Sequence, residues 1–184
     1  MMTNIEMRQC TVHRRRGDST VSFEPAIRVE RRASPRTVAD RVPLLEIMSR
    51  DLVCARPELE LSQIVRLMAQ HAIGCIPVVD AHRHPIGVIT KFDLVEHLDA
   101  MMQSVDTRSP LPSSLAPCVA DEVMMPVALV LEERATVAHA AAMMTLEDTH
   151  HVLVVREGGT LVGVVSAKDI VRWLVANDQL VGRT

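Results

Sequence analysis

The sequence predicts a mixed α/β (α+β) protein built from two tandem repeats, each with the element order β-α-β-β-α. Residues 87–93 read as an apolar strand that ends in a hydroxyl residue and turns into a helix, and residues 163–169 repeat this pattern 76 positions later. The same offset relates the flanking segments without a gap. Each copy of roughly 55 residues is too small to bury its faces well alone, so we expect two copies to share one core with pseudo-twofold symmetry.

Composition sets the predicted boundaries and argues against one class of partner. Residues up to 41 hold nine Arg and five acidic residues, net +4, whereas the remainder holds eleven Lys or Arg and eighteen acidic residues, net −7. The acidic body disfavours broad binding to a phosphate backbone, so we expect no nucleic-acid partner unless the Arg-rich tail binds one. The expected parts are a basic tail (1–37), repeat 1 (38–103), a Pro- and Ser-rich linker (104–118), repeat 2 (119–176) and a C-terminal tail (177–184).

Several other classes of protein are disfavoured. The apolar fraction is 48% and no apolar run reaches 18 residues, so we expect no membrane-spanning helix. The first ten residues are polar and lack the apolar core of a signal peptide, which favours a cytoplasmic location. The four cysteines form no C-x-x-C pair, which argues against a disulfide framework or a zinc site. No catalytic triad has a recognisable signature, and nothing outside the repeats is large enough for a catalytic domain, so we expect no enzyme.

In the first repeat, the elements follow from periodicity and turn residues. Residues 52–55 read as a brief strand, and apolar residues at helical spacing predict a helix from Leu61 to about His71 that Gly74 ends. Residues 76–79 read as a strand, and because Pro77 has no amide hydrogen this strand lies at an edge or starts irregularly. A strand and a second helix follow at 86–89 and 92–102. The second repeat places the same elements at 129–131, 137–144, 152–155, 161–165 and 167–176.

Two interpretations of the repeated strand-to-helix junction remain open. A hydroxyl residue followed three positions later by an acidic one, as in Thr90 with Asp93 and Ser166 with Asp169, is a capping box that needs no ligand. The same helix N-terminus also offers free amides and a positive dipole end to a phosphate. A carboxylate one turn on can then accept hydrogen bonds from a pair of sugar hydroxyls. The only two lysines of the chain, Lys91 and Lys168, both lie in these stretches, and either has the length to reach a phosphate.

The twofold pattern of strand, helix, Pro-containing strand, turn, strand, Gly-x-x-Thr/Ser-x-x-Asp and helix resembles a pair of CBS domains (a Bateman module) over about residues 38–175. The resemblance implies a cleft between the halves with two positions for adenosine-type ligands: AMP, ADP or ATP, and in some relatives NAD or S-adenosylmethionine. It implies that Asp93 and Asp169 hold ribose hydroxyls and that Thr90 and Ser166 contact phosphate. The implied base-pocket residues are Cys75, Ile76 and Pro77 in one half, His151, Val152 and Leu153 in the other, and the backbone near Leu52 and Ala128.

The expected function is therefore that of a stand-alone regulatory module without an obligatory cofactor, which senses an adenine nucleotide and signals to an unidentified protein. The resemblance also implies a homodimer in which helices of two modules meet. One alternative is an interaction module with degenerate ligand sites, whose hydroxyl–carboxylate pairs only cap helices. Another is a nucleic-acid-linked regulator that uses the Arg-rich tail. Because Lys91 and Lys168 fall at different offsets from the hydroxyl residue, and Leu153 stands where repeat 1 has Pro77, we expect two sites of unequal affinity.

Overall fold

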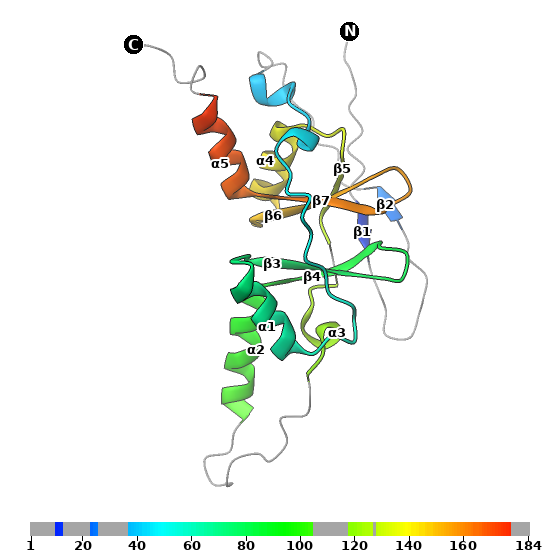
Figure 1. Cartoon of the computed structure of the whole chain (residues 1–184), viewed down its shortest axis with the longest axis vertical. Helices are drawn as coiled ribbons and strands as arrows, with labels where there is room; N and C mark the ends of the chain where they lie inside the picture. Colours follow the sequence, from blue (N-terminus) through cyan, green and yellow to red (C-terminus); the bar gives the residue numbers. More distant parts are fainter. Residues whose placement is uncertain (1–9, 13–22, 26–36, 105–117, 127, 178–184) are drawn as a thin grey trace. The chain divides into compact units, whose positions relative to one another are not determined.

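The computed structural model describes residues 10–12, 23–25, 37–104, 118–126 and 128–177 (Figure 1). These residues form two compact units. Unit 1 contains the described residues of Met1–Leu52 and Ala128–Thr184, and unit 2 those of Val53–Val127. The inner part of the predicted linker, most of the basic tail and residues 178–184 lie outside the described residues.

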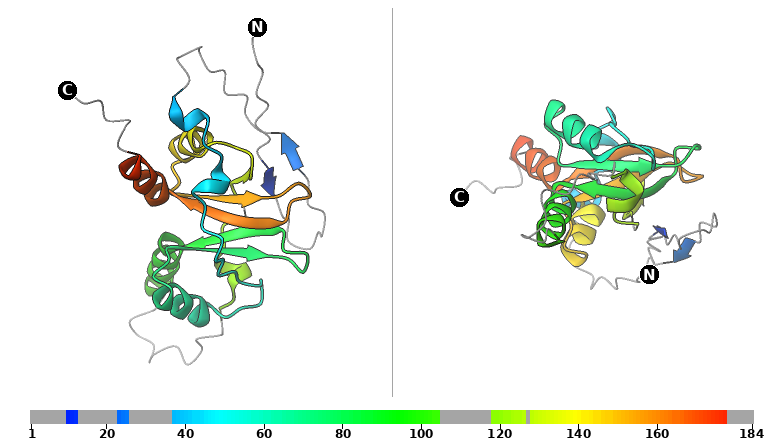
Figure 2. Two further views of the ribbon diagram at one scale, coloured as in Figure 1. Left: turned by 45° about the horizontal axis from the view of Figure 1, so that its top comes forward. Right: turned by 90° about the horizontal axis from the view of Figure 1, so that it is seen from below.

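Unit 2 is a β-hairpin with helices packed against it. Strands β3 (Cys75–Val79) and β4 (Pro85–Thr90) pair antiparallel. Helices α1 (Leu61–Gln70) and α2 (Lys91–Ser104) lie on the same side of this hairpin (Figure 2), and the short helix α3 (Ala120–Val123) completes the unit. The core of the unit consists of buried apolar side chains: Ala55, Ile64, Met68, Ile76, Val78, Ile86, Ile89, Ala120 and Met124.

Unit 1 repeats this order with a third strand. Its sheet has the order β5-β6-β7, with β5 parallel to β6 and β6 antiparallel to β7. Its core lies between the sheet and the helices α4 and α5. The mixed α/β prediction is confirmed, whereas packing of the two repeats around a shared core stays a prediction. The elements are β5 (Val130–Glu132), α4 (Val137–Leu146), β6 (His151–Val155), β7 (Leu161–Ser166) and α5 (Ala167–Ala176), preceded by β1 (Cys10–Val12), β2 (Phe23–Pro25) and the 3₁₀ turns η1 (Val38–Asp40) and η2 (Leu44–Glu46).

The first strand of each repeat differs between the units. In unit 1, β5 pairs with β6 over three residues, and the amide of Leu153 donates to the carbonyl of Leu129 at 2.9 Å. In unit 2 the predicted strand at 52–55 is reduced to one parallel bridge, from Ala55 to Val78. The residue equivalent to Leu153 is Pro77, which has no amide hydrogen to donate. One rung of the ladder is therefore chemically impossible in unit 2.

Unit 1 also contains a segment from the start of the first repeat. Pro43 forms an antiparallel bridge with Thr136, and Ser49 forms one with Val164 on β7. Leu44 between them is fully buried in the core of unit 1. The segment 43–49 therefore packs on the second repeat, although it belongs to the first in sequence.

Unit 2 contains the reciprocal segment. Val119 bridges to Glu60, and Met125 bridges to Val88 on β4. All of these pairs are related to those of unit 1 by the offset of 76. The segment 119–125 thus packs on the first repeat, and the compact units do not coincide with the sequence ranges 38–103 and 119–176.

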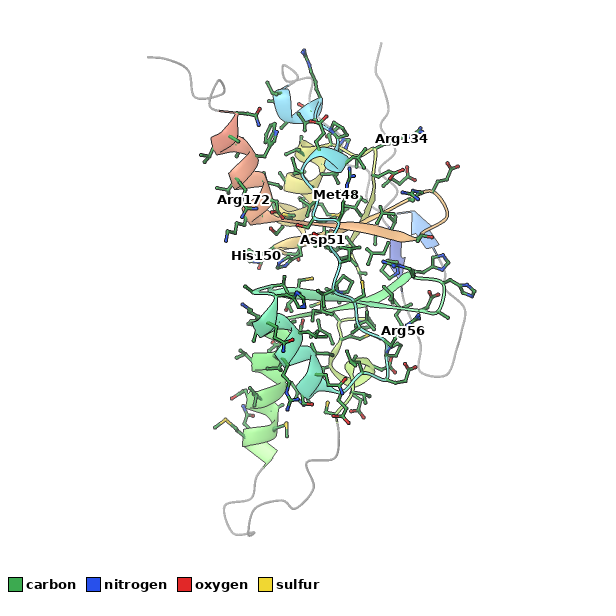
Figure 3. The ribbon with its side chains drawn as sticks, in the orientation of Figure 1. Met48, Asp51, Arg56, Arg134, His150 and Arg172 are labelled. Carbon is green, nitrogen blue, oxygen red and sulfur yellow. The ribbon has the colours of Figure 1, made fainter. Side chains whose placement is uncertain are left out.

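A glycine on each hairpin makes room for the segment that packs on it from the other repeat, 119–125 in unit 2 and 43–49 in unit 1. A Cβ on Gly87 would lie 2.6 Å from the sulfur of Met124 and 2.8 Å from the carbonyl oxygen of Met125. A Cβ on Gly163 would collide with the side chain of Met48, which Figure 3 labels beside β7. These two glycines therefore admit a neighbouring segment of the same unit.

The end of α1 differs from the prediction that Gly74 terminates it. The left-handed residue is Ala72, with φ of 52°. The amide of Ile73 donates to the carbonyl of Met68 at 3.1 Å, and the amide of Ala72 donates to Ala69 at 3.3 Å. This 6→1 and 5→2 pattern is a Schellman motif, which fixes the left-handed position two residues before Gly74.

Candidate functional site

The candidate site of unit 2 lies where β4 turns into α2. The β3–β4 register places Cys75 opposite Thr90. The Thr90 hydroxyl donates to Oδ2 of Asp93 at 2.7 Å, the Thr90 amide donates to the same oxygen at 2.6 Å, and the Asp93 amide donates back to the hydroxyl at 3.4 Å. Asp93 is 8% exposed, and its other oxygen, Oδ1, has no partner among the described residues. A buried carboxylate thus keeps one open acceptor.

The candidate site of unit 1 repeats this arrangement where β7 turns into α5. His151 lies opposite Ser166 in the β6–β7 register. The Ser166 hydroxyl and amide donate to Oδ2 of Asp169 at 2.6 Å and 2.9 Å, and the Asp169 amide donates to the hydroxyl at 3.2 Å. Here Oδ1 of Asp169 is also occupied, because Arg172 donates to it at 3.1 Å. Figure 3 shows Arg172 on α5.

The capping-box interpretation is thus confirmed at both junctions, yet the caps leave part of each helix end open. In α2 the Lys91 amide donates to the carbonyl of Gly74 at 3.1 Å, and the Asp93 amide is taken by Thr90. The amide between them, of Phe92, has no acceptor among the described residues. In α5 the equivalent amide, of Lys168, likewise has no acceptor within the described part of the chain. Each helix therefore retains one free amide and its positive dipole end for an anion.

The hydroxyls at both junctions already use their hydrogen. Each donates it to the carboxylate three residues on, and each also accepts from the helix. A hydroxyl has one donor, so Thr90 or Ser166 must rotate away from its carboxylate to donate to a phosphate. The predicted phosphate contact therefore competes with the helix cap, whereas the side chains of Lys91 and Lys168 are exposed and free of this competition.

Two residues at equivalent positions, Cys75 and His151, have perturbed pKa values. Burial, with smaller contributions from Asp93 and Cys54, raises the pKa of the Cys75 thiol to about 12. Burial and the neighbouring His150 lower the pKa of His151, and Asp169 partly opposes them. Both groups are therefore neutral at pH 7.

The structure groups the predicted residues by unit. Those of repeat 1 on β3, β4 and α2 lie together in unit 2, and those of repeat 2 lie together in unit 1. Leu52 is the exception, because it belongs to unit 1 whereas Val53 begins unit 2. The remaining implied base-pocket residues are buried: Ile76, Pro77, Ala128, Val152 and Leu153.

The residue three positions after each aspartate was not among the predicted site residues. In unit 1 it is Arg172, which pairs with Asp169. In unit 2 it is Glu96, which is exposed on α2. When the two repeats are aligned at the offset of 76, Arg172 falls opposite Glu96. This reversal of charge is therefore visible in the sequence alone.

Over the residues that the structure describes, no helix is long and apolar enough to cross a membrane. Within the same residues, no three His, Cys, Asp or Glu side chains are grouped so as to hold a metal ion.

Comparison with known proteins gives one family. A sequence model of the CBS domain matches residues 44–100 and again residues 119–176. An uncharacterized protein of Methanopyrus kandleri is 26% identical over 127 residues, which cover 69% of this chain and 60% of that protein. The chain therefore spans about three-fifths of the length of this relative.

Solved structures show the same fold. The CBS domain pair of protein MJ0100, in complex with 5′-methylthioadenosine and S-adenosyl-L-methionine, superimposes with a TM-score of 0.62 at 22% identity, covering 73% of this chain and 97% of that one. CBSX2 in complex with AMP gives a TM-score of 0.60 at 18% identity, covering 74% of this chain and 98% of that one. At these identities the likeness concerns the fold.

Proposed function

This chain belongs to the CBS domain family, and on that premise we propose that it is a regulatory module whose two repeats bind adenine nucleotides. AMP, ADP and ATP are the proposed ligands, with NAD and S-adenosylmethionine as further candidates. The module acts by binding rather than by catalysis, needs no obligatory cofactor and works in the cytoplasm. Ligand binding favours one arrangement of the module over another, and a partner protein responds to it.

One observation carries the proposal: the same hydroxyl–carboxylate junction occurs in both units, and in each it leaves an amide of the helix N-terminus open. The helix end suits a phosphate. The buried Asp93 suits a ribose diol, because its Oδ1 has no partner among the described residues. Solved relatives with this fold hold AMP, or 5′-methylthioadenosine and S-adenosyl-L-methionine. All of these ligands carry an adenosine moiety.

Isothermal titration calorimetry with AMP, ATP, NAD and S-adenosylmethionine tests the proposal directly. We expect at least one of them to bind and to raise the melting temperature. Asp93→Ala and Asp169→Ala, each alone, are expected to abolish binding to their own repeat. If none of the four ligands gives heat or a thermal shift, the nucleotide proposal is wrong.

A matched control separates ligand binding from helix capping. Thr136 caps α4 with a capping box of its own, in which its hydroxyl accepts from the His139 amide, and it is none of the residues assigned to a ligand. Thr136→Ala should lower the unfolding free energy by about 1 kcal/mol without changing nucleotide affinity. Asp93→Ala should lower both. The alternative of degenerate sites predicts that Asp93→Ala affects stability alone and that the wild-type chain binds no nucleotide.

We propose further that the module forms a homodimer through α2 and α5. Apolar side chains on these helices are exposed at spacings of three and four residues, which places them on one face of each helix. Leu98 is 58% exposed and Val171 57%. The exposed apolar residues are Phe92, Val95, Leu98, Met101 and Met102 on α2, and Val171, Leu174 and Val175 on α5.

Light scattering coupled to size-exclusion chromatography tests the dimer. Wild type should elute with twice the mass of one chain, and Leu98→Glu should reduce that mass, because a charge in an apolar interface lacks a partner. Gln103→Lys changes an exposed polar residue of the same helix, keeps a donor beside Asp99, and should leave the mass unaltered. A wild-type chain of single mass at micromolar concentration would exclude this interface.

A further inference from the structure

Resting on the proposed nucleotide function, we infer that the two sites select ligands by charge: the site of unit 1 prefers phosphorylated adenosine ligands, and the site of unit 2 prefers uncharged or cationic ones. The two junctions share their backbone geometry, their hydroxyl–carboxylate pair and one open amide. They differ in the charged side chains around these groups. That difference sets the chemical class of ligand which each site takes.

The first step is the charge at the start of each helix. Over residues 166–173 the formal charges are those of Lys168, Asp169 and Arg172, which sum to +1. Over residues 90–97 they are those of Lys91, Asp93 and Glu96, which sum to −1. An anion at the helix N-terminus therefore meets a net charge that is more positive by two in unit 1, because one cation replaces one anion. Interactions between charges a few ångströms apart near a protein surface are strong enough to decide between AMP and adenosine.

The second step is the state of the carboxylate. In unit 1, Arg172 holds Oδ1 of Asp169 at 3.1 Å, while its own side chain is 67% exposed. Such an exposed pair is weak, so the guanidinium is able to leave it for a phosphate, with which it forms stronger, bidentate hydrogen bonds. Arg172 thus places a guanidinium beside the site that is able to bind a phosphate.

In unit 2 the equivalent helix position brings no cation. Glu96 lies one turn after Asp93 on α2, so both carboxylates flank the same helix end and repel a phosphate. Asp93 is also more buried than Asp169, whereas its Oδ1, which has no partner among the described residues, stays accessible to solvent. An accessible acceptor on a mostly buried carboxylate favours the two hydroxyls of a ribose, and the surplus negative charge favours a ligand that lacks phosphate or carries a positive charge.

The test uses the full chain and two probes, uncharged adenosine and anionic AMP, titrated by calorimetry without divalent cations. Asp93→Ala removes the unit 2 site, so that only the unit 1 site binds, and Asp169→Ala removes the unit 1 site, so that only the unit 2 site binds. Should Asp93→Ala fail to fold, Asp93→Asn keeps an oxygen that caps α2 while removing the charge. The quantity compared is the ratio of AMP affinity to adenosine affinity at each remaining site.

We expect this ratio to be about tenfold higher at the unit 1 site than at the unit 2 site, and the difference to shrink as salt is added. Arg172→Glu should lower the ratio at unit 1 about tenfold, while the control Arg172→Lys should largely retain it. Glu96→Arg should raise the ratio at unit 2. The loop before β6 also carries the exposed acids Glu147 and Asp148, and exchanging residue 172 alone separates the effect of Arg172 from theirs.

The outcomes distinguish this inference from the function beneath it. Equal ratios at the two sites, or ratios that neither charge exchange moves, overturn charge selection while nucleotide binding itself stands. Failure of the wild-type chain to bind adenosine, AMP or the other adenine ligands overturns both.

Discussion

The two units match in the lengths of their first helix and of both hairpin strands, yet they hold the first strand of the repeat differently. In unit 1 the amide of Leu153 completes a rung with Leu129, and β5 forms. In unit 2 the equivalent Pro77 has nothing to donate, and only the bridge at Ala55 remains. A single missing amide hydrogen thus separates a strand from a bridge, and the remaining differences between the units test how far their equivalence extends.

The largest effect is expected from giving unit 1 the proline of unit 2. Leu153→Pro removes the donor to the carbonyl of Leu129 within a buried strand. We expect it to lower the unfolding free energy by about 3 kcal/mol, measured by urea denaturation. The control Leu153→Val gives a side chain close in size to proline but keeps the amide hydrogen. It should lower the unfolding free energy by about 1 kcal/mol. Equal losses for both variants would show that the rung contributes little.

A smaller loss of stability is expected when either of the two crowded glycines, Gly87 or Gly163, is replaced by alanine. Gly87→Ala places a methyl group 2.8 Å from the backbone carbonyl of Met125, so the bridge between Val88 and Met125 must open. Gly163→Ala meets the flexible side chain of Met48, which is able to move. We expect losses of about 2 and 1 kcal/mol respectively, by the same denaturation assay. A larger loss for Gly163→Ala would reverse this comparison.

The equivalent residues Cys75 and His151 should give the units opposite pH dependence. The folded pKa of Cys75, about 12, lies above its ordinary value of 9.0, so the folded state retains a proton that the unfolded chain releases, and stability falls as pH rises through 9 toward 12. The folded pKa of His151 lies below its ordinary 6.5, so the unfolded chain binds the extra proton, and stability falls as pH drops below 6.5.

Urea denaturation at pH 5.5, 7.5 and 10 checks both signs. Cys75→Ala should flatten the alkaline loss, and His151→Asn the acid loss. An unchanged acid limb in His151→Asn, or an unchanged alkaline limb in Cys75→Ala, would assign that pH dependence to other groups.

The smallest effect concerns the ends of α1 and α4. Ala72 and Asp148 hold equivalent left-handed positions, with φ of 52° and 48°. Glycine adopts this conformation without strain, so Ala72→Gly should raise the unfolding free energy by about 0.5–1 kcal/mol. The measured sign of this change is an increase in the melting temperature. Asp148→Gly should gain less, because aspartate tolerates this region better than alanine. A destabilised Ala72→Gly would contradict the assignment of the Schellman motif.

Much of the fold could be predicted from the sequence because its signals are local. The spacing of Ile64 and Met68 predicted α1, and the β-α-β-β-α order followed from short apolar runs between turn residues. The capping boxes join residues three apart, so Thr90 with Asp93 and Ser166 with Asp169 were visible as well. The end of α1 was missed because Ala72, not a glycine, takes the left-handed position.

The sequence by itself determined the repeat, the elements and the hydroxyl–carboxylate pairs, since all of these depend on neighbours along the chain. Only the tertiary structure decided which segment completes which unit, because Leu44 and Met124 are buried against residues far away in sequence. It also decided that Oδ1 of Asp169 pairs with Arg172 while Oδ1 of Asp93 has no partner among the described residues. Side-chain pairing and burial depend on contacts in three dimensions, which repeat spacing does not specify.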